Sequence, residues 1–173
     1  RQEDWNVGGL PSAITANQSL GMSGYPCFAS DIGGYRGGTP DEEVLLRWLA
    51  FGTFNGVMQL GGSRGPHMPW AVDSPFSSAA FDVAHKYFRL RMELVPYIFQ
   101  QFVNAHRDGT PVVRSLWLQH PDDPAARAHE RDFYFGPDFL VAPIFTAGAT
   151  ERTHYVPAGR YVDFWTGEPV EGP

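Results

Sequence analysis

Residues 21–35 read Gly21-Met22-Ser23-Gly24-Tyr25-Pro26-Cys27-Phe28-Ala29-Ser30-Asp31-Ile32-Gly33-Gly34-Tyr35, and this stretch decides how the fold is interpreted. The residues from 21 to 29 are small, apolar and nearly continuous, which predicts a strand that is buried on both faces. Asp31 and the two glycines after it are typical of a strand that opens into a loop, because glycine permits tight backbone geometry. We therefore expect a carboxylate at the end of a buried strand.

A helix is predicted downstream of this loop. Thr39 is expected to cap it, Pro40 to take the first helical position and Glu42 to complete a capping box. Residues 56–60 then predict a second short strand, and residues 61–70 a long irregular loop of a kind that often carries function. The apolar residues of the helix recur at helical spacing, namely Val44, Leu45, Trp48 and Leu49.

The same order of elements then repeats. A longer helix is predicted from Ser77 or Ser78, Pro96 is expected to kink or split it, and Gly109 is expected to end it. Residues 111–118 predict a third strand. Strands that alternate with helices are expected to be parallel and joined by helical crossovers, so the fold class is α/β. Three strands are too few to complete a barrel or a doubly wound sheet.

The character of the sequence changes after residue 120. Residues 121–124 predict a turn and residues 125–131 a short helix. Short strands between turns are predicted beyond them, at 139–144, 153–156 and 161–165. We therefore predict two parts: residues 1–120 with the α/β pattern, and residues 121–173 as a linker and the first strands of a β-sandwich-like domain.

Composition excludes several classes of function. The chain has 173 residues, a net charge of −6 and scattered basic residues, which argues against nucleic-acid binding. No apolar run approaches the roughly 20 residues that span a bilayer. Cys27 is the single cysteine and cannot form an internal disulfide, and the histidines lack metal-ligand spacing. We expect no metal and no organic cofactor, while the compartment and the oligomeric state stay open.

Four stretches in order resemble glycoside hydrolase family 31, the family of α-glucosidases and α-xylosidases. Together they extend over nearly the whole chain. They are residues 20–26 running into 30–35, residues 47–54 with 57–60, residues 94–98 with 109–116, and residues 135–143 with 156–159 and 163–167. The resemblance implies the C-terminal portion of a (β/α)8 TIM barrel over residues 1–120. It also implies that residues 121–173 begin the proximal C-terminal β-domain.

The resemblance also implies a retaining glycosidase, which needs two carboxylates about 5–5.5 Å apart. The nucleophile of the family lies upstream of these residues. Alignment on Trp5 places the acid/base residue immediately before Arg1, with Asp4 as the alternative position. The chain is thus expected to be a fragment that is inactive alone, and its partner is a carbohydrate, an α-glucoside or an α-xyloside.

Substrate-binding residues follow from the same resemblance. Asp31 matches the aspartate that binds hydroxyls of the sugar in the −1 subsite, and an ionised carboxylate can accept two hydroxyl hydrogens at once. The alternative is an aspartate that caps its own turn. Asp4 and Trp5 are further candidates beside the site. Gly61 stands where close relatives carry a histidine, and His67 could replace that side chain or be an ordinary loop residue.

Three side chains have competing interpretations. Trp5 and Trp70 could each stack on a sugar or pack in the core, and Arg114 is expected to be a buried ion-pair partner rather than a catalytic group. The rival functions are a non-catalytic carbohydrate-binding or scaffold domain derived from the barrel, and a transglycosylase or lyase of the same family.

Overall fold

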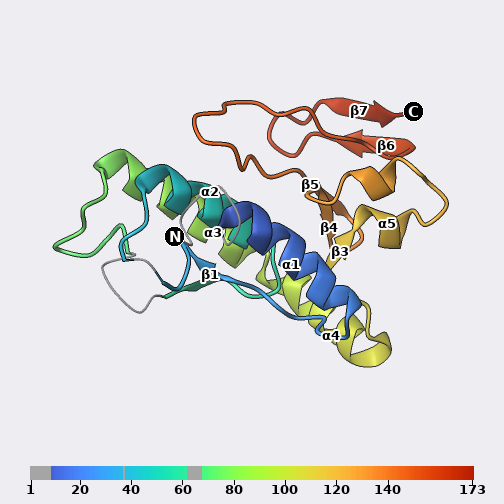
Figure 1. Ribbon diagram of the computed structural model, residues 1–173, viewed down its shortest axis with the longest axis horizontal. Coiled ribbons are helices and arrows are strands. Elements are labelled where there is room, and N and C mark those ends of the chain that lie inside the picture. Colours follow the sequence, from blue (N-terminus) through green and yellow to red (C-terminus); the bar gives the residue numbers. More distant parts are fainter. Residues whose placement is uncertain (1–8, 37, 62–67) are drawn as a thin grey trace.

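The computed structural model describes residues 9–36, 38–61 and 68–173 (Figure 1). Its first part alternates helices and short strands, as the α/β pattern predicts. The elements are α1 (Leu10–Met22), β1 (Asp31–Ile32), α2 (Glu42–Thr53), β2 (Gln59–Leu60), α3 (Ser78–Glu93) and α4 (Val95–Asp108). Strands β1 and β2 pair in parallel, and α2 is the crossover between them. Within the described ranges, no helix combines the length and the apolar character needed to cross a bilayer.

The strand predicted over residues 21–29 is wrong. Helix α1 extends through Gly21 to Met22, and the residues from Ser23 to Ser30 are irregular. Position 21 of the helix has no room for a side chain, because a Cβ atom there would lie 2.9 Å from Cβ of Pro111. The small residues that suggested a buried strand are thus needed partly for close packing of a helix, and the strand itself begins only at Asp31.

The start of α2 also differs from the prediction. The N-cap is Asp41 rather than Thr39, and its carboxylate accepts a hydrogen bond of 2.9 Å from the backbone N–H of Glu43. Glu42 does not complete a capping box, because its carboxylate accepts hydrogen bonds from the backbone N–H and the hydroxyl of Ser77. Glu42 therefore joins the start of α2 to the start of α3.

Three predicted features of the next two helices are confirmed. Ser77 caps α3 and accepts a hydrogen bond from the N–H of Ala80 at 3.1 Å. The break falls at Leu94, so Pro96 lies in the first turn of α4, where its missing N–H costs nothing. Gly109 ends α4 in the left-handed conformation with φ of 77°.

The strand predicted over residues 111–118 is shorter and has a different partner. Only β3 (Val113–Ser115) is extended, and α5 (Leu116–Gln119) follows it directly. Strand β3 pairs antiparallel with β4 (Phe133–Phe135), which pairs antiparallel with β5 (Phe139–Val141). In the described part of the chain, β3 is therefore not a third strand of the parallel sheet. The division at residue 120 stays a prediction.

The C-terminal segment is built from short elements. The predicted helix at 125–131 is a single 3₁₀ turn, η1 (Ala126–Ala128). Strands β6 (Gly159–Val162) and β7 (Pro169–Gly172) form an antiparallel hairpin. The predicted strand at 161–165 ends early, because the Asp163 carboxylate accepts hydrogen bonds from two backbone N–H groups in the turn that follows. Residues 153–156 are not a strand.

One hydrophobic core joins the helices to the antiparallel sheet. Phe51 packs edge-on against Phe133 with ring centroids 5.7 Å apart, and Phe54 packs against Phe135 at 6.0 Å. Helix α2 thus contacts both the parallel strands and β4. Figure 1 shows α1, α2 and α3 gathered beside β1, with β6 and β7 at the opposite side of the molecule. The fully buried side chains of this core include Leu10, Ile14, Ile32, Leu45 and Leu49.

Candidate sugar-binding site

Asp31 lies at the junction between an irregular segment and the parallel strand pair. It is the first residue of β1, directly opposite Gln59 of β2. The chain turns sharply after Ile32, because Gly33 and Gly34 have φ of 80° and 84°, and the N–H of Gly34 donates to the backbone carbonyl of Asp31 at 3.0 Å. The predicted role of the paired glycines in a tight loop is confirmed.

Asp31 and Gln59 are among the residues that line a pocket of about 270 Å³. The Asp31 side chain is partly exposed, and its Oδ1 accepts a hydrogen bond of 2.9 Å from Nε2 of Gln59. The alternative role, in which the Asp31 side chain caps its own turn, is not what the described residues show, since the turn is closed by the backbone carbonyl. The remaining residues of the pocket are Cys27, Phe28, Ala29, Ser30 and Val57.

Neighbouring elements hold the walls of this pocket. Nε1 of Trp48, a buried residue of α2, donates to the Ser30 hydroxyl at 3.0 Å. The N–H of Val112 donates to the carbonyl of Pro26 at 2.9 Å and fixes the irregular segment that precedes β1. The pocket therefore has a fixed backbone frame and an aspartate among its lining residues, which suits a ligand that offers hydroxyl donors.

Gly61 follows β2 and lies beside the carboxylate. A Cβ atom at this position would lie 3.2 Å from Oδ1 of Asp31 and 3.5 Å from Nε2 of Gln59. The other candidates, Asp4, Trp5 and His67, lie outside the described residues. The structure therefore places Asp31 with Gln59 and Gly61, and it does not place the remaining candidates relative to them.

Trp70 and Arg114 have structural contacts. Trp70 is half exposed and packs edge-on against Phe88 of α3, with ring centroids 5.2 Å apart. Arg114 is buried, but the ion pair expected for it is wrong within the described part of the chain. Its Nε donates to the carbonyl of Pro111 at 2.9 Å, and its other nitrogens lie at long hydrogen-bond distance from the side-chain oxygens of Gln101 and Gln119. Neutral acceptors thus satisfy the guanidinium.

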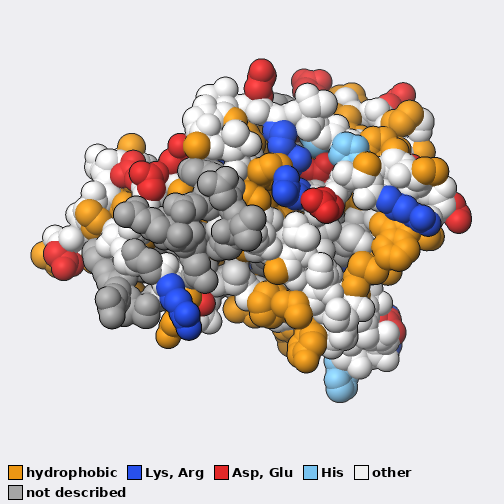
Figure 2. All heavy atoms as spheres, in the orientation of Figure 1, with side chains coloured by type: hydrophobic (Ala, Val, Ile, Leu, Met, Phe, Trp, Pro, Cys, Tyr) orange, Lys and Arg blue, Asp and Glu red, His pale blue; other side chains and the backbone are white. Residues whose placement is uncertain are grey.

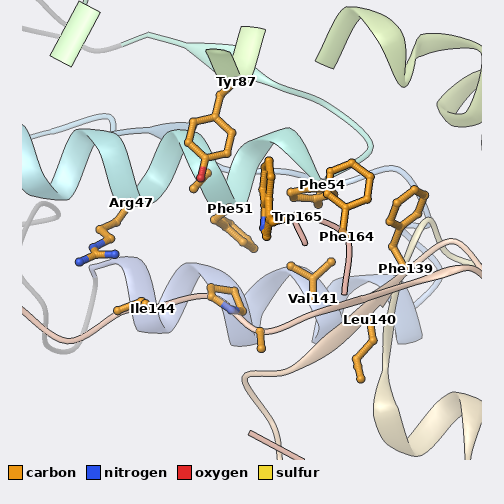
Figure 3. A pocket seen from close by; sticks show the side chains of 13 residues that line it. Arg47, Phe51, Phe54, Tyr87, Phe139, Leu140, Val141, Ile144, Phe164 and Trp165 are labelled. Carbon is orange, nitrogen blue, oxygen red and sulfur yellow. The ribbon is translucent and has the colours of Figure 1, made fainter. Parts of the chain in front are cut away.

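A second pocket, which the sequence analysis missed, lies between the helices and the C-terminal segment (Figure 3). Its volume is about 270 Å³, and aromatic rings turn into it from α2, α3, β5 and the turn after β6. Arg47 lies at one end, held by the Glu43 carboxylate and the Ala149 carbonyl. No carboxylate lines this pocket among the described residues, so it offers apolar contact rather than acid–base chemistry. The rings are Phe51, Phe54, Tyr87, Phe139, Phe164 and Trp165.

The described residues show neither a continuous basic surface on the face seen in Figure 2 nor a cluster of metal-binding side chains. On the face seen in Figure 2, the described lysine and arginine side chains lie in separate small groups between acidic ones. No group of three or more histidine, cysteine, aspartate or glutamate side chains in the described ranges is arranged to hold a metal ion.

Comparison with known proteins agrees with this architecture. The profile described as "Glycosyl hydrolases family 31 TIM-barrel domain" matches residues 3–101, and "Glycosyl hydrolase family 31 C-terminal domain" matches residues 109–173. Alpha-glucosidase 2 of Bacillus thermoamyloliquefaciens is 35% identical over 94% of this chain, which spans 20% of that protein's length.

Two solved structures extend the likeness to three dimensions. A GH31 alpha-xylosidase from a soil metagenome, complexed with xylose, superposes with a TM-score of 0.87 at 30% identity over 98% of this chain and 28% of its own. The cycloalternan-degrading enzyme of Trueperella pyogenes, in complex with a covalent intermediate, superposes with a TM-score of 0.83 at 32% identity over 93% of this chain and 23% of its own. The chain belongs to glycosyl hydrolase family 31, with part of the TIM-barrel domain followed by part of the C-terminal domain.

Proposed function

We propose that these residues are part of a retaining α-glycoside hydrolase of the α-glucosidase or α-xylosidase type, and that Asp31 binds the sugar in the −1 subsite. The observation that carries this proposal is that Asp31 and Gln59 line one pocket, where the Asp31 carboxylate accepts a hydrogen bond from Gln59. The named activities of the relatives and the xylose bound to one of them support a carbohydrate ligand.

The chemistry of Asp31 suits a sugar with neighbouring hydroxyl groups. An ionised carboxylate offers about four acceptor sites, and Gln59 uses one of them. Hydrogen bonds from hydroxyls to a charged oxygen are shorter and stronger than bonds between neutral groups. The carboxylate can therefore accept two adjacent ring hydroxyls and orient the sugar for attack at its anomeric carbon.

The two carboxylates of the double displacement are proposed to lie outside the described residues. The nucleophile is upstream, and the acid/base is the residue before Arg1, with Asp4 as the alternative. A covalent intermediate, such as the one captured in the structure of the cycloalternan-degrading enzyme, is the species that a retaining mechanism forms. Asp31, Asp4, Trp5 and His67 are proposed as substrate-binding groups, and no cofactor or metal takes part.

The test is made in the full-length protein that carries these residues. Asp31→Ala is expected to lower kcat/KM for aryl α-glucosides and aryl α-xylosides by at least about tenfold, because a hydrogen bond to a charged group contributes about 1.5–3 kcal/mol. Asp82→Ala, on an exposed position of α3, is the matched control. An unchanged kcat/KM in Asp31→Ala would remove Asp31 from the site, and sugar binding without turnover by the parent protein would favour a carbohydrate-binding scaffold.

A further inference from the structure

Gln59 holds Asp31 from the neighbouring strand. The two residues are register partners in a parallel pair, so their side chains emerge on the same face, and Nε2 of Gln59 lies 2.9 Å from Oδ1 of Asp31. Gln59 is exposed. Holding an exposed, rotamer-rich side chain costs conformational entropy, and a hydrogen bond in water returns little net stability. The contact is therefore better explained by what it does to Asp31 than by stability.

A neutral donor has a particular effect on a carboxylate. An arginine or lysine at position 59 would fix the Asp31 side chain but would also cancel much of its charge. The amide of Gln59 fixes one oxygen and leaves the charge available for ligand hydroxyls. We propose that Gln59 is a positioning residue that sets the rotamer of Asp31 for a sugar diol without reducing its negative charge. This inference rests on the proposed function of Asp31.

Gly61 lies next to this pair and leaves it free of side-chain contact from position 61. A Cβ atom would lie 3.2 Å from Oδ1 of Asp31, closer than an ordinary van der Waals contact, and 3.5 Å from Nε2 of Gln59. A side chain at position 61 would require the Asp31 carboxylate to shift by a few tenths of an ångström. Gln59 holds the carboxylate, and Gly61 lets it stay in that position.

A pH test of the pair uses the ratio of variant to wild type, because the other titratable groups proposed for the site, among them Asp4 and His67, are the same in both proteins. Among the described residues that line the pocket, Cys27 is the only titratable group besides Asp31, and burial raises the pKa of its thiol. Gln59→Glu replaces the amide donor with a second carboxyl group next to the first. Two carboxyl groups at this distance share one proton at low pH and repel each other when both are ionised.

The experiment compares Gln59→Glu and Gln59→Met with wild type in the full-length protein. The substrate is an aryl α-glucoside or an aryl α-xyloside, and kcat/KM is measured at each pH from 4.5 to 8. The quantity compared is the kcat/KM of the variant divided by that of wild type at the same pH. At pH 7.5 both variants are expected to fall by at least about tenfold. On acidification the Gln59→Glu ratio is expected to rise by about tenfold, because a shared proton restores the hydrogen bond, while the Gln59→Met ratio stays flat. The loss is expected in KM more than in kcat, and thermal unfolding shows that each variant is folded.

Gln100→Glu is the matched control, because Gln100 is also exposed and also donates its amide to a side-chain oxygen, that of Asn104 on α4. Its ratio is expected to stay near one at every pH. A Gln59→Glu ratio that does not change with pH, in a protein where Asp31→Ala loses activity, overturns this inference and leaves the proposed function intact. Full activity of Asp31→Ala overturns both.

Discussion

Arg91 of α3 binds the end of α2 and the segment that leads to β2, the strand that carries Gln59, and Arg91→Met is expected to loosen that segment. Its Nη1 donates to the carbonyl of Thr53 at 3.0 Å and also to the carbonyl of Asn55, and its Nη2 donates to the carbonyl of Gly56 at 2.7 Å. All three acceptors belong to buried residues. Burial lowers the pKa of the Arg91 guanidinium to about 10, so the side chain stays protonated at neutral pH.

The magnitude follows from the three bonds and from the partial burial of the side chain. Each hydrogen bond from a charged donor contributes about 1.5–3 kcal/mol, and a buried carbonyl left unpaired carries a similar penalty. The simple sum overestimates the loss, because a half-buried site admits water and single substitutions rarely cost more than about 4–5 kcal/mol. We expect local opening of residues 54–60 to become easier by about 3 kcal/mol, which is about a 100-fold change in the opening equilibrium.

Hydrogen exchange followed by mass spectrometry measures the local opening equilibrium of residues 54–60 directly. Peptides that span residues 54–60 are expected to exchange about 100-fold faster in Arg91→Met than in wild type. Arg89→Met is the matched control, since Arg89 is exposed on the same helix. Equal protection of this segment in the two variants would refute the reasoning that Arg91 holds the approach to β2.

Two further predictions concern backbone strain and the pocket thiol. Gly136→Ala is expected to destabilise the fold by at least about 2 kcal/mol, because Gly136 has φ of 58° and a methyl group there would overlap the Tyr97 hydroxyl. Gly148→Ala is the control, because Gly148 has φ of 70° but open space around it. Thermal unfolding measures both variants, and equal unfolding midpoints would contradict the prediction. Burial raises the pKa of the Cys27 thiol, so less thiolate is present at neutral pH than for a free thiol. Alkylation of this single cysteine is expected to level off at a higher pH than alkylation of a free thiol and to slow when a sugar occupies the pocket, whereas a plateau at or below the pH found for the free thiol would disagree.

Local signals in the sequence predict several elements correctly, because the physics that sets them is local. A serine caps α3, a proline ends α3 and opens α4, and a glycine adopts the left-handed conformation at the end of α4. Each of these acts through the backbone within one turn. The glycines after Asp31 belong to the same class, since their positive φ angles are needed only for the turn that they form.

The errors arise where the deciding contact is distant in sequence. Position 21 is a glycine because helix α1 approaches Pro111 closely there, and this contact is not visible in a run of small residues. Glu42 caps α3 through Ser77 rather than its own helix. Strand β3 has the composition of a buried strand, but its partner β4 follows it, so its direction of pairing depends on the turn between them.

The candidate site also contains one residue that local sequence signals identify and one that depends on a contact distant in sequence. Asp31 is identifiable from its place before two glycines and from the family resemblance. Gln59 is not, because its importance depends on the register that sets it opposite Asp31. Residues 57–60 carry part of the family resemblance, but nothing in that stretch singles out Gln59 until the strands are paired.

A structure of the full-length protein with glucose or xylose bound tests the central claim most directly. We expect both oxygens of the Asp31 carboxylate to lie within about 2.5–3.0 Å of neighbouring sugar hydroxyls, with Gln59 still donating to Oδ1. A sugar ring bound in the barrel with no hydroxyl near this carboxylate would contradict the account.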